Sequence, residues 1–240
     1  MNIEITKEKT VAEIVTENMG ADHVFSKYKI DFCCGGNLAL GAVCEENNID
    51  FDNIKKEIEA IKNIITNDSN FDNLNIEALI DYVQNNYHTY FTESIPVLLQ
   101  LTSKVAQVHG EQHKEVVAVN STFIKFSNLL IEQLETNLND VFPSIKKIIT
   151  SDKEQIETSS PNWINLKEAI QNIEKLHIKE GDFFKEIRQL TSNYTTPVNA
   201  CNTYISLYRN LQKLEQKLHK YIHFEINILF PKVLKFNTNN

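Results

Sequence analysis

Apolar and polar residues follow a helical rather than a strand-like period along most of the chain. Strictly alternating stretches are few, and helix-forming residues such as Leu, Ile, Glu, Lys and Gln dominate. Breaks fall at Gly110, at Ser159–Pro161 and at Thr195–Pro197. Four long segments between these breaks carry the helical pattern: residues 75–106, 110–149, 162–193 and 198–235. We therefore predict an all-α protein whose main part is an up-down four-helix bundle.

A shorter helical unit precedes the bundle. Thr10 is expected to cap a helix over residues 11–28, the Gly35-Gly36 pair breaks the chain, and further helices are expected over 38–46 and 51–64. Asn and Asp, which bond their own backbone, crowd the segment that follows. The expected organisation is a three-helix domain over 1–65, a linker over 66–74, the bundle over 75–236 and a tail over 237–240.

The two halves of the bundle repeat each other faintly. Gln100–Ser103 recurs 89 residues later as Gln189–Ser192, and His88 recurs at the same offset as His177. A Phe-Pro pair also returns, after 88 residues: Phe142-Pro143 and Phe230-Pro231. Two copies of a helical hairpin, each with a histidine at the same place, predict a site between the halves.

The repeat aligns further polar residues on the second helix of each hairpin. Glu225 matches Asn137, and one helical turn earlier Tyr221 matches Gln133. Together with His88 and His177, these residues are expected to form an inward-facing polar ring. Of the four residues on the second helices, only Glu225 is a strong metal ligand. For either histidine alone, an ordinary hydrogen-bonded or solvated side chain is the simpler interpretation. Their matched placement favours a shared interior site.

The remaining histidines predict no site. His109 and His113 flank a glutamate, but Gly110 stands where a zinc-protease motif has that glutamate. The others are expected at the surface or at the rim of the bundle: His23, His219 and His223.

Charge and composition narrow the function classes. The formal charge of −8 and the lack of a basic patch argue against binding to nucleic acid or to an anionic membrane. No stretch approaches the roughly 20 apolar residues of a membrane span, and the charged segment Met1–Lys9 does not resemble a secretory signal. The four cysteines are too few for a disulfide framework. We therefore expect a cytoplasmic protein with reduced thiols.

Two adjacent cysteines, Cys33 and Cys34, stand directly before the glycine pair. A helix beginning near Asn37 would favour a thiolate at its N-terminus. Such a pair could bind metal, be oxidised, or transfer sulfur or iron; the alternative is two small, half-buried residues in a tight turn. Zinc is disfavoured because the usual C-x-x-C spacing and a second pair are absent.

This motif resembles the hallmark of a known family. Asp31–Gly36 is closely similar to the signature of the small N-terminal domain of the iron-sulfur cluster repair di-iron proteins, also called the Repair of Iron Centres family. Later segments resemble that family's hemerythrin-like bundle: Tyr87-His88, Val108–Gly110, Arg188–Thr191, Pro197–Cys201 and Ile228–Pro231. The resemblance covers roughly residues 8–235.

The resemblance implies a non-haem di-iron centre held by four histidines and two bridging glutamates. Three of the six ligand positions in this pattern hold a matching residue in this chain, and three do not. The matching residues are His88, His177 and Glu225; the replaced positions hold Gln133, Asn137 and Tyr221. Neutral amides are poor iron ligands, and one glutamate cannot neutralise two iron ions in a low-dielectric core. An ordinary di-iron site is therefore not expected.

Two interpretations of this altered centre stay open. In the first, His88, His177 and Glu225 hold a single iron, with Tyr221 as a phenolate ligand and the two amides bonding a bound water. In the second, the core is a metal-free polar plug and the cysteine pair acts alone. A helical slip could bring Glu132 or Glu135 inward, and for Glu135 it would need a bulge.

The resemblance implies a cytoplasmic stress protein that repairs iron-sulfur clusters damaged by nitric oxide or oxidants, rather than a turnover enzyme. Its expected partners are damaged iron-sulfur proteins or the cluster-assembly machinery, and a homodimer stays open. Two alternatives are an oxygen or nitric oxide sensor with one iron, and a metal-free interaction module that docks through Cys33 and Cys34.

Overall fold

The computed structural model describes residues 5–18, 20–32, 36–61, 71–150 and 160–236. Across these residues the predicted all-α class is confirmed, since the one strand-like feature is an isolated bridge between Thr10 and Ala39. The chain divides into two compact units. Unit 1 holds Met1–Leu79 and His219–Lys232, and unit 2 holds Ile80–Leu218 and Val233–Asn240. Most of the expected linker over 66–74 and the expected tail lie outside the described residues.

Unit 1 begins with a capped helix, α1 (Val11–Glu17), as the sequence predicts. Thr10 Oγ1 accepts from the Glu13 backbone N–H, and the Glu13 carboxylate accepts from the Thr10 backbone N–H at 2.8 Å. This capping box satisfies two backbone donors at the helix start.

The expected single helix over 11–28 is wrong, because the chain breaks at Asn18. The backbone there is extended, with φ −146° and ψ 90°, and the Asn18 side-chain oxygen accepts from the Gly20 backbone N–H. Such local side-chain bonding competes with helix continuation. A second helix, α2 (Ala21–Lys27), follows, so with α3 (Leu40–Glu46) and α4 (Phe51–Ile61) the described part of this segment forms four short helices in place of the three expected.

The helix expected near Asn37 begins only at Leu40. Residues after the cysteine motif pair instead with the first residues of α1: Val11 N–H donates to Leu38 O, and Ala12 N–H donates to Gly36 O at 2.8 Å. Gly36 is required by this close approach, since a Cβ there would lie 2.5 Å from the Phe32 carbonyl oxygen.

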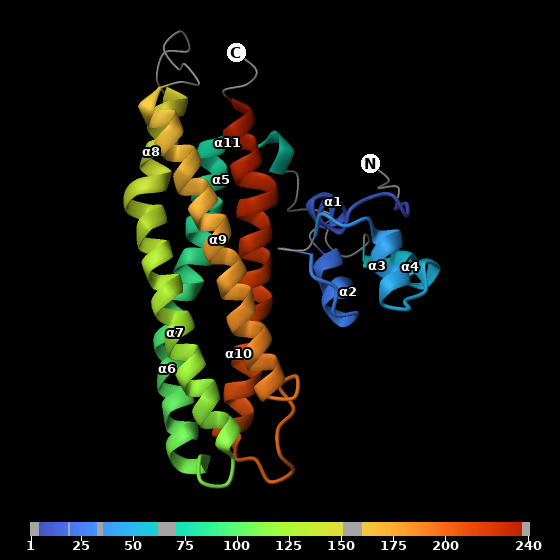
Figure 1. Ribbon diagram of the computed structural model, residues 1–240, viewed down its shortest axis with the longest axis vertical. Helices are drawn as coiled ribbons and strands as arrows, with labels where there is room; N and C mark the ends of the chain where they lie inside the picture. Colours follow the sequence, from blue (N-terminus) through green and yellow to red (C-terminus); the bar gives the residue numbers. More distant parts are fainter. Residues whose placement is uncertain (1–4, 19, 33–35, 62–70, 151–159, 237–240) are drawn as a thin grey trace. The chain divides into compact units, whose positions relative to one another are not determined.

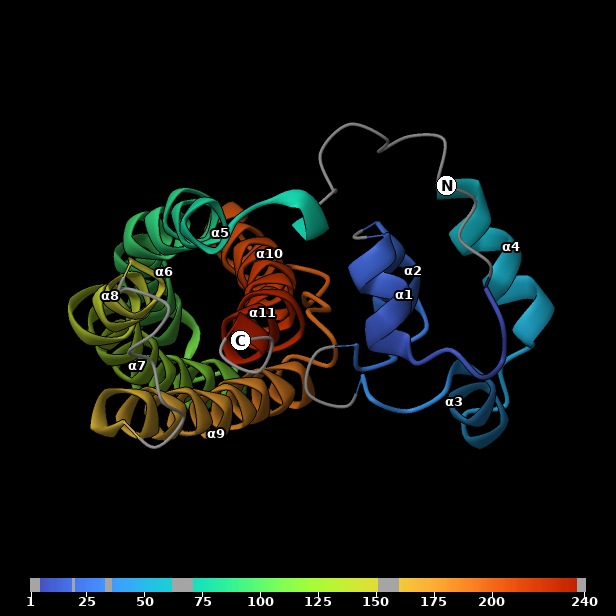
Figure 2. The ribbon, with the colours of Figure 1, turned by 90° about the horizontal axis from the view of Figure 1, so that it is seen from above.

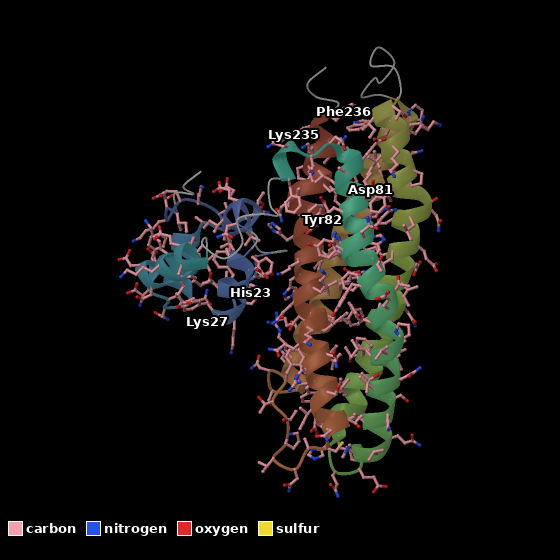
Figure 3. All side chains as sticks on the ribbon, turned by 180° about the vertical axis from the view of Figure 1, so that it is seen from behind. His23, Lys27, Asp81, Tyr82, Lys235 and Phe236 are labelled. Carbon is pink, nitrogen blue, oxygen red and sulfur yellow. The ribbon has the colours of Figure 1, made fainter. Side chains whose placement is uncertain are left out.

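Helix α2 contacts α4 through charged and polar side chains. Lys27 Nζ lies 2.7 Å from a Glu57 carboxylate oxygen, and the Tyr28 hydroxyl donates to the same carboxylate. His23, labelled with Lys27 on α2 in Figure 3, has a side chain that is 60% exposed, as the sequence predicts.

Residues 76–150 and 161–236 form four helical runs that follow the four predicted segments (Figures 1 and 2). The first run is α5 (Ile76–Val83), η2 (Gln84–His88) and α6 (Thr89–His109); the second is α7 (Lys114–Thr136), η3 (Asn137–Val141) and α8 (Phe142–Thr150); the third is α9 (Pro161–Leu190); the fourth is α10 (Asn202–Phe224), η4 (Glu225–Leu229) and α11 (Phe230–Phe236). Helix α7 packs against both α6 and α9. The breaks at Gly110 and at Thr195–Pro197 fall between helices as predicted, α9 begins at Pro161, and residues 151–159 lie outside the described ranges.

Aromatic packing holds α7 and α9 together in unit 2. Phe126 and Phe184 are fully buried, and their rings meet edge to face with centroids 4.8 Å apart. Such pairs add to the burial of apolar area. Helices α5 and α8 are joined by an ion pair: Lys146 Nζ of α8 lies 3.6 Å from Oδ1 of Asp81 of α5, which Figure 3 labels. Of the helices in the described ranges, none is long and apolar enough to cross a membrane.

Candidate functional site

Three turns of π-helix mark the expected site positions. His88 ends η2, Asn137 begins η3 and Glu225 begins η4. A π-helical turn inserts one extra residue into an α-helix and occurs often at functional sites. Its coincidence with three residues chosen from the repeat supports a functional reading of these positions.

All six residues of the expected polar ring are buried. None has more than 4% of its surface exposed: His88, Gln133, Asn137, His177, Tyr221 and Glu225. Glu135 is exposed even though η3 follows it closely, so the helical slip considered for this segment does not occur. Burial of so many polar groups is costly unless each is hydrogen-bonded or bound to a ligand.

His177 of α9 pairs with a carboxylate that the sequence analysis missed. Its Nδ1 lies 2.8 Å from Oε2 of Glu180, and both side chains are fully buried. The Gln133 side-chain nitrogen lies 3.5 Å from each ring nitrogen of His177. Unit 2 therefore contains a buried imidazole and carboxylate joined by a hydrogen bond, with an amide beside them.

His88 is held in an apolar environment in unit 2. Its ring stacks on Phe142 with centroids 5.5 Å apart. Burial lowers the pKa of His88 to about 4. The imidazole is therefore neutral at neutral pH, and the neutral form is the one that binds metal.

The chemistry of these donors fits iron, because neutral imidazole and carboxylate are ligands that it accepts. Within the described ranges, no three side chains of His, Cys, Asp or Glu form a group that could hold a metal ion. The assignment of His88, His177, Glu225 and Tyr221 as ligands therefore stays a prediction.

The cysteine motif itself, Cys33 and Cys34, lies outside the described residues, but its neighbour Phe32 does not. Phe32 is buried in unit 1, and its ring meets those of His219 and His223 edge-on, with centroids 5.8 and 6.2 Å away. The residue before the cysteine pair is thus anchored on two histidines.

The surface or rim position expected for His223 is wrong, because this side chain is fully buried. Helix α1 contacts η4, and Thr16 of α1 lies within hydrogen-bond distance of His223 Nε2 at 3.3 Å. Asn227 lies 3.1 Å from the other ring nitrogen. Burial lowers the pKa of His223 to about 4, so this histidine is a neutral, hydrogen-bonded residue of unit 1.

His109 lies beside a thiol in unit 2. Its Nε2 is 3.2 Å from Sγ of Cys201, which directly precedes α10, whereas His113 Nδ1 is 3.0 Å from a Glu115 carboxylate oxygen. The two histidines thus have separate partners, which agrees with the rejection of a zinc-protease motif.

We expect Cys201 to react with iodoacetamide faster than Cys44. Cys201 is exposed and its Sγ lies 3.2 Å from the His109 imidazole, whereas Cys44 is buried and its burial raises the pKa of the thiol. Mass spectrometry of peptides during alkylation measures both rates, and His109→Ala should slow only Cys201. Equal rates for the two thiols would contradict this prediction.

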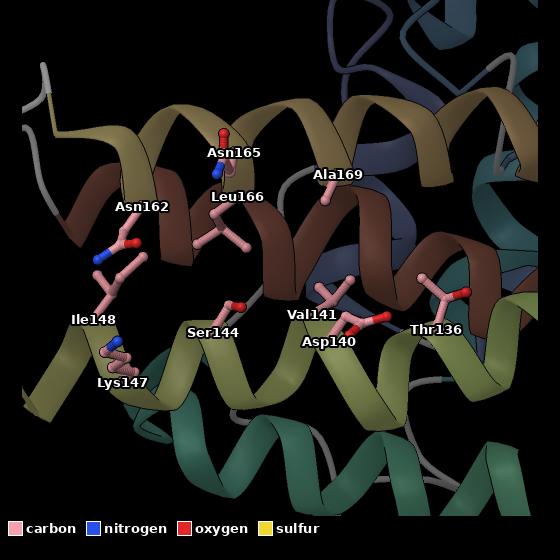
Figure 4. A pocket seen from close by; sticks show the side chains of 10 residues that line it. All are labelled: Thr136, Asp140, Val141, Ser144, Lys147, Ile148, Asn162, Asn165, Leu166 and Ala169. Carbon is pink, nitrogen blue, oxygen red and sulfur yellow. The ribbon is translucent and has the colours of Figure 1, made fainter.

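A cleft of about 380 Å³ opens between the η3–α8 segment and α9 (Figure 4). Asn162 and Asn165 lie on its α9 side, and its lining includes one carboxylate, Asp140, and one ammonium group, Lys147. The cleft offers no cluster of metal-binding or nucleophilic side chains. The buried pair on α9 is the stronger candidate.

Comparison with known proteins decides the family. The ScdA_N family model, described as a domain of unknown function, matches residues 7–62. The iron-sulfur cluster repair protein ScdA of Staphylococcus haemolyticus is 32% identical over 228 residues, which cover 95% of this chain and 99% of that protein. The chain belongs to the iron-sulfur cluster repair protein family.

More distant members of the repair family match over a similar span. A probable iron-sulfur cluster repair protein of Haemophilus influenzae is 27% identical over 95% of this chain and 97% of its own length. The repair protein YtfE of Yersinia pseudotuberculosis is 26% identical over 90% of this chain and 91% of its own length. The family resemblance drawn from the cysteine motif and the bundle segments is thereby confirmed.

Proposed function

We propose that this protein repairs iron-sulfur clusters damaged by nitric oxide or oxidants, and that it binds non-haem iron among buried histidine and carboxylate side chains. The observation that carries the proposal is the match to ScdA of Staphylococcus haemolyticus, which spans 95% of this chain and includes both the cysteine motif and the bundle. Its clients would be damaged iron-sulfur proteins or the machinery that assembles clusters.

The proposed iron centre is mononuclear or weakened relative to a di-iron site. Its proposed ligands are His88, His177 and Glu225, with Tyr221 as a further candidate. Amides at Gln133 and Asn137 are neutral and bind iron poorly, which is the reason for expecting fewer or more weakly held ions. The burial of all these side chains and the neutral state of His88 support the proposal.

The bound iron would supply a redox-active ion that can be delivered to, or exchanged with, a damaged cluster. The residues of the chain would bind and orient that ion and exclude bulk water from it. Cys33 and Cys34 are proposed to contact the client and take part in the transfer of iron. The protein then acts as an iron-handling repair factor rather than as a turnover enzyme.

Reactivation of an iron-sulfur hydratase that nitric oxide has inactivated tests this function. The full-length protein, purified and loaded with iron without oxygen, should restore more activity than the same amount of free ferrous iron. Serum albumin with ferrous iron is the control for nonspecific protection. Recovery no greater than in that control would contradict the proposed repair activity.

A further inference from the structure

The strongest feature that the proposed function does not yet use is the buried carboxylate of Glu180. Glu180 and His177 lie three positions apart on α9, so both point from one face of that helix. Neither has any exposed side-chain surface, and the contact between them is 2.8 Å. Burial of an ionisable pair costs several kcal/mol per charge before the pair's own attraction is counted. A merely structural role would be served as well by two apolar residues.

The contact with Glu180 involves one of the two ring nitrogens of His177. Nδ1 is the ring nitrogen that faces Glu180, 2.8 Å from Oε2. Nε2 is the nitrogen on the other side of the ring, and the Gln133 side-chain nitrogen lies 3.5 Å from it. Metal-binding histidines commonly donate their other ring N–H to a carboxylate in this way, which fixes the ring and strengthens the remaining nitrogen as a ligand.

We propose that Glu180 is a positioning residue that prepares His177 to bind a divalent transition-metal cation through Nε2. This inference rests on the proposed iron centre and names a residue that supports it. An ionised Glu180 would also offset the charge of a cation taken into a low-dielectric interior. The rigid i, i+3 spacing on a long helix keeps the two side chains in register.

Titration of the full-length, metal-free protein with cobalt(II) tests the inference. The visible bands of cobalt(II) report both its affinity and the set of ligands around it. Glu180→Gln keeps the size and a hydrogen-bond acceptor but removes the charge, and it should weaken cobalt(II) binding by about 10–100-fold. At saturating cobalt(II) the spectrum should match that of the wild type, because a positioning residue does not touch the metal.

Glu215→Gln provides the matched control. Glu215 is also a buried carboxylate of unit 2, but it forms an ion pair with Arg188, whose Nε lies 2.9 Å from Oε1, and it accepts from the Tyr194 hydroxyl at 2.8 Å. The same substitution there should leave cobalt(II) affinity unchanged. Equal weakening in both variants would mean that a general loss of structure causes the effect, and would overturn the role of Glu180.

The remaining outcomes separate this inference from the proposed function. Wild-type binding with unchanged affinity in Glu180→Gln overturns the inference alone, as does an altered spectrum, which would make Glu180 a direct ligand. No binding by the wild type overturns both the iron centre and the inference. The nitrogen-15 spectrum of the wild-type histidines needs no variant: a protonated Nδ1 on His177 is expected, and a proton on Nε2 alone contradicts the proposal.

Discussion

Replacing His177 by leucine should lower the free energy of unfolding of the metal-free protein by about 3–5 kcal/mol. The substitution removes the imidazole that lies 2.8 Å from a fully buried carboxylate. Glu180 would then stay in the interior without that hydrogen bond, or take up a proton at a cost in free energy. Urea unfolding followed by circular dichroism measures the loss, provided that the slope with urea concentration is unchanged.

The double variant His177→Leu with Glu180→Leu should regain most of that stability. Replacing a whole buried pair by apolar residues of similar volume is often neutral, whereas removing one member is not. Both variants should fail to bind iron, so the double variant separates the metal role of the pair from its structural role. A single substitution that costs less than about 1 kcal/mol, or a double variant as unstable as the single one, would contradict this account.

Replacing Cys33 and Cys34 together by serine should reduce repair of a damaged cluster enzyme to the level seen with free iron. Serine is nearly the same size but is a poor ligand for iron and does not form the thiolate that metal transfer needs. The iron content of the protein should stay unchanged, because the proposed centre uses histidine and carboxylate ligands. Reactivation of the nitric-oxide-treated hydratase, with the iron content of each preparation, is the measurement.

Cys201→Ser is the control for the cysteine pair. Cys201 is an exposed thiol beside His109, and it belongs to neither the proposed iron centre nor the Cys33-Cys34 motif. Its loss should leave repair intact. Full repair by the Cys33→Ser, Cys34→Ser variant would show that the bundle acts without the pair.

The helical runs could be predicted from the sequence because their signals are long and local. Apolar residues recur with a helical period over more than twenty residues in α7 and α9, and Gly110 and Pro161 stand at the breaks. The faint repeat also selected six polar residues that are each buried. A matched offset constrains which face of each helix turns inward, even where the residue types differ.

A local side-chain hydrogen bond and contacts with distant parts of the chain explain the wrong predictions in unit 1. Asn18 ends α1 through one side-chain hydrogen bond, and a pattern of apolar residues does not report such a bond. His223 looked peripheral because its environment comes from a distant part of the chain, where Thr16 and Phe32 lie. The π-helical turns were not predicted, because one extra residue in a single turn hardly changes a helical period that is read over a long window.

Glu180 could have been found from the sequence. It lies on the buried stripe of α9, whose members recur every three or four residues: Trp163, Leu166, Ile170, Ile173, His177, Glu180, Phe184 and Ile187. A carboxylate on an otherwise apolar stripe, three residues after a histidine, is unexpected for packing alone. The ligand pattern of the family asks only for a histidine on this helix, so Glu180 stands outside that pattern.

Iron per chain, with a Mössbauer spectrum, on protein purified without oxygen tests the central claim most directly. The account predicts about one iron per chain without magnetic coupling to a second ion, and no iron in the folded His177→Leu, Glu180→Leu variant. A coupled iron pair would contradict the altered centre, and iron retained by that variant would contradict the role of His177.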